Sequence, residues 1–381
     1  MKNNLKILII PSWFDVTEKT PFGIFFKEQA ISLLEHNRVY FLYFNFSKSY
    51  SNKCNIYRKN RLIYIVININ PIFKLGTISL IFFSIYFFLK LNFKKRVDIV
   101  HAHSILNAGL VAFVFKFLFS KPYLITEHHT KYLITDKHNF FYFIELLIVN
   151  KANVLISVSN SLSKRLELRF KKTRWITINN LVNPNFLKFG LNKKNNSKFI
   201  ISTTALLTSK KNINLLIESF VLLSKTDNNI FLNIIGDGPD KEKLINLAKE
   251  NNIISSVCFH GNLNDIEIID ILSNSDIFVL PSRIETFGIA IIEAMSLGLP
   301  VIVTRSGGPE TYVNETNGIV IEPNSVKQLY QALIKMKSEY KNYNSNNIKT
   351  YILNHFSSDI ISTKITNIYK SIYENNNNFR G

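Results

Sequence analysis

Short runs of β-branched and aromatic residues alternate along the chain with longer segments of helical periodicity. The runs are three to eight residues long, as expected for strands buried in a sheet. The expected strands are 5–10, 39–44, 62–69, 97–101, 123–126, 154–158, 175–178, 199–203, 231–235, 257–260, 277–280, 301–303 and 319–321. Such alternation predicts an α/β protein with parallel sheets and helices on both faces of each sheet.

The 381 residues are enough for two domains of ordinary size. The pattern of strands and helices pauses at the polar stretch 192–197, which is therefore the predicted linker. This places an N-terminal domain at residues 1–190 and a C-terminal domain at residues 191–357. The tail from residue 374 to 381 contains four successive asparagines and is expected to be disordered.

Cysteine content and hydropathy favour a cytoplasmic protein. The two cysteines, Cys54 and Cys258, fall in different predicted domains, so neither a disulfide framework nor a thiolate metal site is indicated. The first apolar run ends at Pro11 and is typical of a first buried strand rather than of a signal peptide. The most apolar stretch, 75–89, is shorter than the roughly 20 residues that span a bilayer.

The formal charge of +19 is concentrated in residues 1–190, which hold 27 Lys and Arg against 9 Asp and Glu. Aromatic and basic residues also gather in one segment of this half, at Phe82, Phe83, Tyr86, Phe87, Phe88, Lys90, Lys94, Lys95 and Arg96. We expect this face to contact an anionic membrane, on its inner side, as a peripheral protein does. The alternative is a buried aromatic helix. No nucleic-acid-binding motif is present, and no nucleic-acid partner is expected.

Two glutamates, Glu285 and Glu293, bracket a glycine-containing turn after the expected strand 277–280. A helix is predicted to begin near Phe287 and to end at Gly298. In such a βαβ unit the ligand lies beyond the carboxyl ends of the strands, where free amides at a helix start attract phosphate. Gly288 lets the backbone approach an anion closely.

Carboxylates at these positions suit the hydroxyls of a sugar or ribose better than phosphates, which they repel. The alternative is that Glu285 and Glu293 are ordinary solvated helix charges. A second glycine turn, Gly307-Gly308, follows the next expected strand. The whole segment therefore predicts a nucleotide-sugar site.

The segment matches the pattern E-x-F-G-x4-E-A-M-x2-G-x-P-V at every specified position from Glu285 to Val301. Here the chain resembles the retaining glycosyltransferases of family 4, and the resemblance extends over roughly residues 5–370. It implies a GT-B architecture, in which two Rossmann-like domains face a central cleft. It also implies an acceptor-binding N-terminal domain, joined by a final helix at 358–373, and a nucleotide-sugar-binding C-terminal domain.

The resemblance implies roles for several residues of the C-terminal domain. Glu285 would contact the hydroxyls of the donor sugar, and Glu293 would bind the ribose. The diphosphate would be held by Lys211 and by backbone amides at Phe287, Gly288 and Ile289.

One position departs from the family. Where the family carries an arginine on the diphosphate, this chain has Leu206, and either Lys210 or Arg283 could replace it. The alternative for Lys210 and Lys211 is that both are solvated surface lysines.

Four further positions match the family. Gly236 lies in a G-x-G-P turn, and His260 ends a strand where the family's backbone contacts the base. Gly23 resembles a glycine loop that closes over donor and acceptor. His128 matches a Thr-x-His near the reacting sugar, where an imidazole could hydrogen-bond the donor or its leaving group.

His128 belongs to a group of four histidines at expected strand ends, with His101, His103 and His129. Two histidines at alternating positions of one strand share a face, so a zinc site is conceivable, although nothing fixes the remaining ligands. Hydrogen-bonded packing is the alternative for the other three. The chain has no Asp-x-Asp, and we expect neither a metal nor a cofactor.

These observations predict a metal-independent glycosyltransferase that uses a UDP- or GDP-sugar, and the resemblance implies that it retains the anomeric configuration. A glycan or lipid-linked molecule is the expected acceptor, in the assembly of a bacterial surface polysaccharide such as lipopolysaccharide or capsule. Two alternatives stay open. One is a nucleotide-sugar epimerase of the same architecture, and the other is a catalytically silent membrane adaptor or partner subunit.

Overall fold

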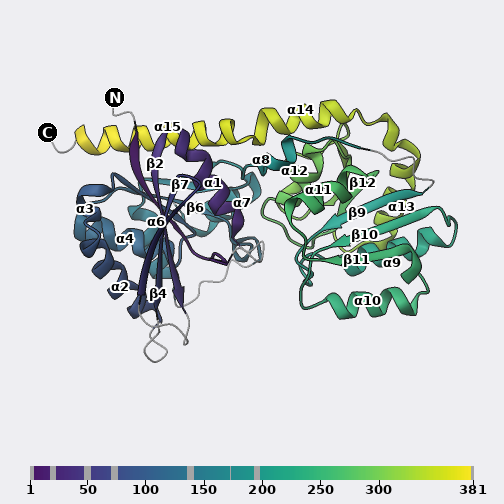
Figure 1. The fold of residues 1–381 in the computed structure, drawn as a ribbon, viewed down its shortest axis with the longest axis horizontal. Helices are drawn as coiled ribbons and strands as arrows, with labels where there is room; N and C mark the ends of the chain where they lie inside the picture. The colour runs from purple at the N-terminus through teal and green to yellow at the C-terminus, as the bar shows by residue number, and fades with distance from the viewer. Residues whose placement is uncertain are drawn as a thin grey trace. The chain divides into compact units, whose positions relative to one another are not determined.

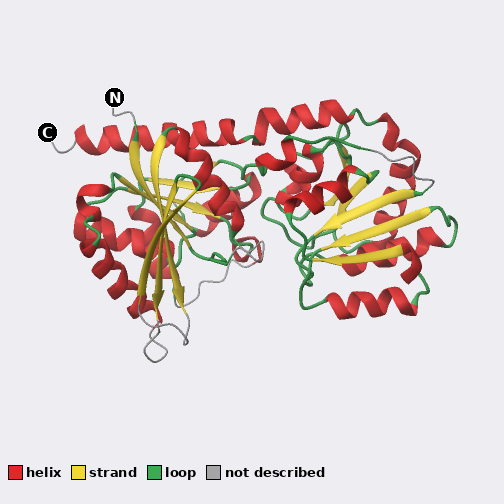
Figure 2. Ribbon diagram, in the orientation of Figure 1, coloured by secondary structure: helices red, strands yellow, loops and turns green. Residues whose placement is uncertain are grey.

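The computed structural model describes residues 4–17, 23–46, 53–69, 76–134, 141–171, 173–192 and 198–378. The chain forms two compact units. Unit 1 comprises the residues up to Asn180 together with the C-terminal helix, and unit 2 runs from Leu181 to Ser357. Each unit contains one sheet with helices packed on its faces, as the strands and helices of Figure 2 show.

Unit 1 is built on an eight-stranded sheet with the strand order β3-β4-β2-β1-β5-β6-β7-β8. The strands are β1 Leu5–Pro11, β2 Asn37–Phe46, β3 Lys53–Lys59, β4 Leu62–Ile69, β5 Ile99–His103, β6 Tyr123–Glu127, β7 Val154–Ser157 and β8 Ile176–Thr177. Its helices are α1 Ile24–Ser32, α2 Gly76–Lys90, α3 Phe93–Arg96, α4 Ala108–Phe119, α5 Lys131–Ile134, α6 Tyr142–Lys151, α7 Asn160–Arg169 and α15 Ser358–Asn378.

Seven of these strands lie at the expected places, but the sequence pattern missed β3. This strand pairs antiparallel with β4 in a hairpin whose turn is Asn60-Arg61, so the sheet is mixed and not wholly parallel. Six of the seven β3 side chains are exposed. An edge strand that faces water on both sides shows no alternation of apolar and polar residues, and its charged residues resemble those of a loop.

Helices cover both faces of the sheet of unit 1. Helices α2, α4 and α6 pack side by side on one face, and α4 contacts β5 and β6. On the other face α15 packs against α1 and β5, and Figure 1 shows α15 running along this side of unit 1. Right-handed crossovers require this division, because the chain leaves β1 in one direction for β2 and in the other for β5, β6 and β7.

Unit 2 is built on a six-stranded parallel sheet with the order β11-β10-β9-β12-β13-β14. Its strands are β9 Phe199–Thr204, β10 Ile230–Ile235, β11 Val257–Gly261, β12 Ile277–Leu280, β13 Val301–Thr304 and β14 Gly318–Ile321. Its helices are α8 Pro184–Leu187, α9 Ile213–Ser224, α10 Lys241–Glu250, α11 Asp265–Ser273, α12 Ile289–Ser296, α13 Val326–Glu339 and α14 Ser345–Phe356.

Both sheets reverse the direction of strand order at an internal pair, β1/β5 in unit 1 and β9/β12 in unit 2. In open α/β sheets, ligands bind beyond the carboxyl ends of the strands at such a switch point. The topology therefore marks two places in the molecule, the loops after β1 and β5 and the loops after β9 and β12.

Two expectations about the ends of the units need correction. The boundary lies after Asn180 rather than at residue 190, because α8 packs against α11 and α12 of unit 2. Of the expected linker 192–197, only Asn192 lies within the described residues. The tail is helical as far as Asn378, as part of α15, and was wrongly expected to be disordered from residue 374.

Candidate functional site

In unit 2, Lys211 and Glu285 form an ion pair at the switch point between β9 and β12. Lys211 lies in the loop between β9 and α9, and Glu285 lies in the loop between β12 and α12. The Glu285 side chain is 10% exposed and that of Lys211 is 26% exposed. The sequence placed both residues at a ligand site, and the fold brings them together at the carboxyl ends of the strands.

The turn after Glu285 depends on a glycine. Gly288 has φ +92°, and a Cβ there would lie 2.7 Å from Ile291 Cδ1 and 3.2 Å from the hydroxyl of Tyr312. Helix α12 begins at Ile289, two residues later than predicted, with Gly288 as its N-cap. Because the first amides of a helix have no intrahelical partner, the helix start presents N–H groups that can bind an anion.

Tyr312 fixes the carbonyl groups of the same turn. Its hydroxyl is buried and lies 2.6 Å from the carbonyl oxygen of Phe287 and 3.2 Å from that of Gly288. Burial, followed by the negative charges of Glu285 and Glu310, raises the pKa of Tyr312 well above its ordinary value. The phenol therefore stays protonated and donates to the turn. No local motif in the sequence pointed to this residue.

Glu293, the other glutamate of the motif, lies on α12 and is partly exposed. It is separated from Gly288 by about one and a half helical turns. The structure thus places Glu293 on the helix whose first turn follows Glu285.

Two glycines after β10 pack directly on the loop that leads to Lys211. A Cβ on Gly236 would lie 1.9 Å from the carbonyl oxygen of Ala205, and one on Gly238 would lie 2.4 Å from that of Leu207. The amide of Leu207 also donates to the carbonyl of Asp237 at 2.8 Å. Only glycine allows this approach, so Gly236 and Gly238 position the β9–α9 loop.

His260, at the end of β11, belongs to a polar chain within the sheet of unit 2. Its Nε2 lies 2.8 Å from Asn233 Oδ1, and Asn233 Nδ2 donates to Ser202 Oγ at 3.2 Å. Desolvation lowers the pKa of His260, so the imidazole is neutral at physiological pH. Its side chain is thus occupied by the protein, while its backbone lies at the carboxyl edge.

Leu206, at the family's arginine position, has an exposed side chain. The nearby Arg283 is attached to the loop of Lys211 in two ways. Its amide donates to the carbonyl of Lys210 at 2.8 Å, and its Nε donates to Asn212 Oδ1 at 3.0 Å. A guanidinium group is therefore held beside the β9–α9 loop, although not at the position where the family carries it.

In unit 1, a pair of buried histidines lies at the carboxyl ends of β5 and β6. His103 Nδ1 and His128 Nε2 are 3.1 Å apart, so one donates to the other. Burial lowers both pKa values well below the ordinary 6.5, and neighbouring imidazoles lower them further. Both rings are neutral at physiological pH. His103 Nε2 and His128 Nδ1 are buried without a hydrogen-bond partner.

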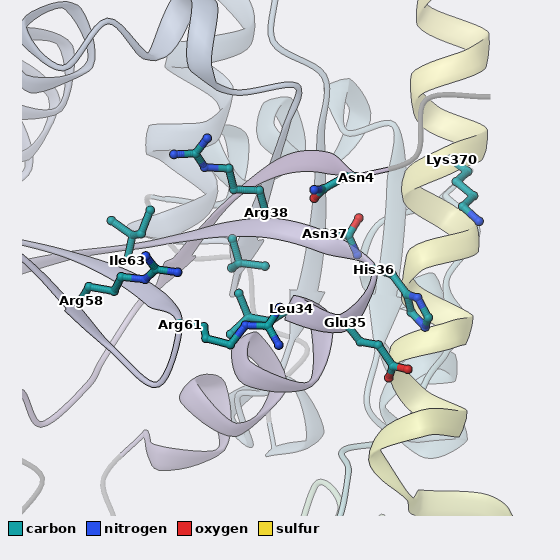
Figure 3. Close-up of a pocket in the computed structure, with 11 residues that line it drawn as sticks. Asn4, Leu34, Glu35, His36, Asn37, Arg38, Arg58, Arg61, Ile63 and Lys370 are labelled. Atoms are coloured by element: carbon teal, nitrogen blue, oxygen red, sulfur yellow. The ribbon is translucent and has the colours of Figure 1, made fainter.

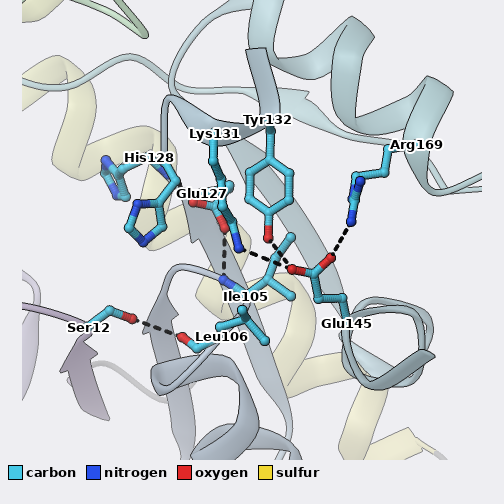
Figure 4. Close-up of polar contacts among 10 residues, drawn as sticks. Ser12, Ile105, Leu106, Glu127, His128, Lys131, Tyr132, Glu145 and Arg169 are labelled. Atoms are coloured by element: carbon cyan, nitrogen blue, oxygen red, sulfur yellow. Dashed lines mark hydrogen bonds and ion pairs between the residues drawn. The ribbon is translucent and has the colours of Figure 1, made fainter. Parts of the chain in front are cut away.

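Glu127, which the sequence analysis missed, holds the loop that carries His128. This fully buried carboxylate accepts the amide hydrogens of Ile105, His128 and His129, each at 2.8 Å. Figure 4 shows Glu127 between the Ile105 loop and His128. Three backbone donors satisfy a buried carboxylate well, so Glu127 joins the ends of β5 and β6.

A second buried carboxylate, Glu145 on α6, binds side chains of α5 and α7 (Figure 4). It accepts hydrogen bonds from Arg169 Nη2 at 2.9 Å, from the hydroxyl of Tyr132 at 3.0 Å and from Lys131 Nζ at 3.1 Å. Burial and the charges of Glu127 and Glu145 raise the pKa of Tyr132, which keeps its hydroxyl protonated. This cluster ties α5, just after His128, to α6 and α7.

Gly23 lies close to the same histidines. It has φ +77°, and a Cβ there would meet the carbonyl oxygen of Trp13 at 2.5 Å. The rings of Phe25 and Phe26, which follow it, lie 5.1 Å from that of His128. The fold therefore gathers Gly23 and His128 at the switch point of unit 1. The rest of the expected glycine loop, 20–22, lies outside the described residues.

The other two histidines have structural partners. His101 Nδ1 lies 2.7 Å from the hydroxyl of Tyr369 on α15, and its Nε2 lies 2.8 Å from Thr126 Oγ1. The His129 ring packs on Trp13, with 4.4 Å between the ring centroids. Within the described ranges, no three His, Cys, Asp or Glu side chains gather as a metal site would require.

The expected membrane face is exposed only in part. Phe87 and Phe88 are buried, and Phe88 packs on Phe115 and Phe119 of α4. In contrast, Ile78, Phe82, Tyr86 and Leu89 of α2 are exposed at helical spacing. The neighbouring helices α4 and α6 expose Phe117, Leu118, Phe143 and Leu147. In the part of the chain that the structure describes, no helix is both long and apolar enough to cross a membrane.

Comparison with known proteins gives two family matches. The model described as glycosyl transferases group 1 matches residues 185–351, and the model described as glycosyltransferase family 4 matches residues 33–186. An uncharacterized glycosyltransferase of Methanocaldococcus jannaschii is 26% identical, over 73% of this chain and 76% of its own length. The capsular polysaccharide biosynthesis glycosyltransferase CapM of Staphylococcus aureus is 25% identical, over 70% and 74%.

Solved structures agree over nearly the whole chain. Sucrose-phosphate synthase of Thermosynechococcus elongatus has a TM-score of 0.79 at 18% identity, covering 97% of this chain and all of that one. HepE of Anabaena, solved in complex with UDP, has a TM-score of 0.75 at 16% identity, covering 96% and 100%. These solved structures show that the chain has the GT-B fold of two Rossmann-like domains. Because the two matched models together span residues 33–351, the chain belongs to the family 4 type of glycosyltransferases.

Proposed function

We propose that the protein transfers a sugar from a UDP- or GDP-sugar to a glycan or a lipid-linked acceptor, with retention of the anomeric configuration. The observation that carries this proposal is the Lys211–Glu285 ion pair beside the Gly288 turn, at the switch point of unit 2. A cation, a carboxylate and a helix start together provide what a nucleotide sugar requires.

In this proposal each group of unit 2 takes one part of the donor. Lys211 and the amides of Phe287, Gly288 and Ile289 neutralise the diphosphate, as the positive end of a helix does. Glu285 accepts hydrogen bonds from the sugar hydroxyls. Arg283, held beside Lys210 and Asn212, supplies the charge that Leu206 lacks.

The remaining donor contacts lie at the edges of this group. Glu293 accepts the ribose hydroxyls from α12, and the backbone after His260 contacts the base. Gly236 keeps the β9–α9 loop close to the phosphates. The diphosphate is thereby neutralised by the protein, and we propose that the reaction needs no metal ion.

In unit 1 the proposed contacts to the reacting sugar come from His128 and from the backbone at Gly23. Burial holds His128 neutral, so it acts as a hydrogen-bond donor or acceptor and not as a cation. His103 positions it through the 3.1 Å contact between their rings. The acceptor is proposed to bind unit 1.

The proposed place of action is the cytoplasmic side of a membrane in surface polysaccharide assembly. Exposed apolar side chains of α2, α4 and α6 lie on adjacent helices. The exposed Lys90 ends α2, and the exposed Lys95 and Arg96 lie on α3, which contacts α2. Such a face suits a peripheral contact with anionic lipid. CapM, the capsule glycosyltransferase to which the chain is similar, supports a role of this kind.

The test of the donor site is binding of UDP, GDP, ADP and CDP by titration calorimetry. We expect one nucleotide to bind selectively, and Glu293→Ala to weaken its binding about tenfold or more because a carboxylate that accepts ribose hydroxyls is lost. Glu322→Ala is the control, since Glu322 is an exposed glutamate paired with Arg305. If no nucleotide binds, the silent adaptor becomes the better interpretation.

A further inference from the structure

A pocket lies at the opposite end of the unit 1 strands from the histidines His103 and His128. It has a volume of about 500 Å³ and is formed by the amino ends of β1, β2 and β4, the β3–β4 hairpin and α15. Figure 3 shows Arg58 and Arg61 of the hairpin on one side of this pocket and Lys370 on α15. Because it lies at the amino ends of the strands, it is separated from His103 and His128 by the length of the sheet.

The pocket is strongly basic. Four of its lining residues, Arg38, Arg58, Arg61 and Lys370, carry a positive charge, and Glu35 carries the single negative charge. None of the four cations forms an ion pair with a carboxylate within the described residues. Cations that converge on a hollow without carboxylate partners attract an anion.

A buried side chain that lines the pocket, Asn37, adds a second, independent feature. Asn37 is only 4% exposed, and its Nδ2 donates to the carbonyl of Leu33 at 3.2 Å and to Thr366 Oγ1 at 3.0 Å. The Leu33 carbonyl can only accept, so the orientation of the amide is fixed. Asn37 Oδ1 is left buried without a partner. A ligand hydroxyl would satisfy this oxygen.

An adjoining cavity of about 410 Å³ shares Arg38 and Ile63 with the pocket. Apolar and aromatic side chains line much of it, together with the cations Lys6 and Arg96. A ligand with a carbon skeleton could extend from the basic pocket into this cavity. The pair of cavities therefore accommodates more than an inorganic ion.

We infer that the pocket bounded by Arg38, Arg58, Arg61, Lys370 and Asn37 binds a phosphate ester that carries a free hydroxyl group. The guanidinium groups bind the phosphate oxygens, and Asn37 Oδ1 accepts a hydrogen bond from the hydroxyl. Soluble phosphorylated polyols and the phosphoglycerol headgroup of a lipid share this chemistry. The site is separate from the proposed donor site in unit 2, so the tests of the two proposals can fail or succeed independently.

The test uses glycerol 3-phosphate as a soluble probe and the double variant Arg58→Gln/Arg61→Gln. Both arginines are exposed, so the substitutions leave the core unchanged. We expect titration calorimetry to give binding by the wild type and at least a tenfold loss in the variant, because two charge-assisted contacts disappear. Methyl phosphate, which lacks a hydroxyl, is expected to bind about fivefold more weakly than glycerol 3-phosphate.

The matched control is Lys243→Gln/Lys249→Gln, which removes the same charge from exposed positions of α10. It should bind glycerol 3-phosphate like the wild type, and both double variants should keep nucleotide binding. Co-sedimentation with phosphatidylglycerol or phosphatidylcholine vesicles forms the second arm. Binding to the former alone, lost only in the arginine variant, assigns the phosphate to a lipid headgroup.

Two outcomes overturn the inference. One is that neither glycerol 3-phosphate nor phosphatidylglycerol binds, and the other is that both double variants lose binding equally. Equal affinity for methyl phosphate overturns the part assigned to Asn37.

Discussion

The two switch points of the molecule share a topology but differ in their chemistry. In unit 1 the carboxyl ends of the central strands carry buried, neutral imidazoles, and a carboxylate bound by backbone amides holds their loop. In unit 2 the corresponding place carries the partly exposed Lys211–Glu285 pair and a turn that only glycine can form. Burial therefore keeps the imidazoles of one site neutral, whereas the other site holds a cation beside a carboxylate.

This difference supports the proposal that unit 2 binds the donor diphosphate and unit 1 contacts the sugar. A nucleotide diphosphate requires fixed positive charge and free amides, which unit 2 provides. A neutral imidazole can form hydrogen bonds with sugar hydroxyls, and unit 1 provides two buried imidazoles of this kind. The same fold thus supports either role, and the side chains at the strand ends decide between them.

Lowering the pH should reduce the free energy of unfolding of unit 1 more than that of unit 2, and this is the largest effect that we expect. Burial lowers the pKa of His101 to about 3 and the pKa values of His103 and His128 well below 6.5. The unfolded chain binds protons below about pH 6.5 that the native state does not, so the free energy of unfolding falls as the pH drops. For three such groups we expect a slope of up to about 4 kcal/mol per pH unit below pH 6.

Tryptophan fluorescence during urea unfolding measures this slope for unit 1 alone, because both tryptophans, Trp13 and Trp175, belong to it. His101→Gln should reduce the slope by the contribution of about one proton. His355→Gln removes an exposed imidazole of unit 2 and should leave it unchanged. A native state that becomes more stable between pH 6 and 5 would contradict the assignment of neutral histidines.

Glu285→Gln tests the charged site of unit 2. Glutamine keeps the size of the side chain but loses the charge that pairs with Lys211, and it accepts hydroxyls through one oxygen. We expect release of nucleotide from the donor to slow about 10²- to 10³-fold, with nucleotide affinity changed much less. Glu322→Gln, at an exposed ion pair, should stay close to the wild-type rate, and an unimpaired Glu285→Gln enzyme would exclude the proposed role.

Much of the fold could be predicted because a buried strand can be recognised from its own short run of residues. Runs such as Ile277–Leu280 are apolar throughout, since both faces of a parallel sheet are covered. The edge strand Lys53–Lys59 has no such requirement and looked like a loop. The last turns of α15 contain asparagines, which favour other structures, but the helix is anchored by buried residues such as Tyr369 and Ile372.

The residues of the candidate site also fall into two groups, those that the sequence predicted and those that it missed. Glu285, Gly288 and Lys211 could be found because they belong to short segments with a recognisable spacing. Glu127 and Tyr312 were missed because each acts through the backbone of a distant segment, and only the fold brings donor and acceptor together. Sequence patterns indicate the groups that meet a ligand more readily than those that position them.

Gly288→Ala tests whether the turn of unit 2 needs glycine. At φ +92° an L residue is strained, and the Ile291 side chain, 2.7 Å from the new Cβ, would have to move. We expect a loss of about 2–3 kcal/mol in the free energy of unfolding, with weaker nucleotide binding. Hydrogen exchange of peptides that cover residues 285–296 should detect the loosened turn. Gly190→Ala has open space around it and should change neither quantity.

The smallest expected effect comes from Tyr312→Phe. The variant removes the hydroxyl that donates to the carbonyl of Phe287 and leaves that carbonyl buried, which costs about 1–2 kcal/mol. Because the turn loses one support but keeps its glycine, nucleotide affinity should fall only threefold to tenfold.

Tyr123→Phe is the matched control in unit 1, where the hydroxyl of Tyr123 donates to the carbonyl of Ile148. It should lower the stability of unit 1 by a similar amount without changing nucleotide affinity. If both variants weaken nucleotide binding equally, the effect of Tyr312 is general destabilisation. If Tyr312→Phe alone weakens it, the hydroxyl of Tyr312 positions the amides that bind the diphosphate.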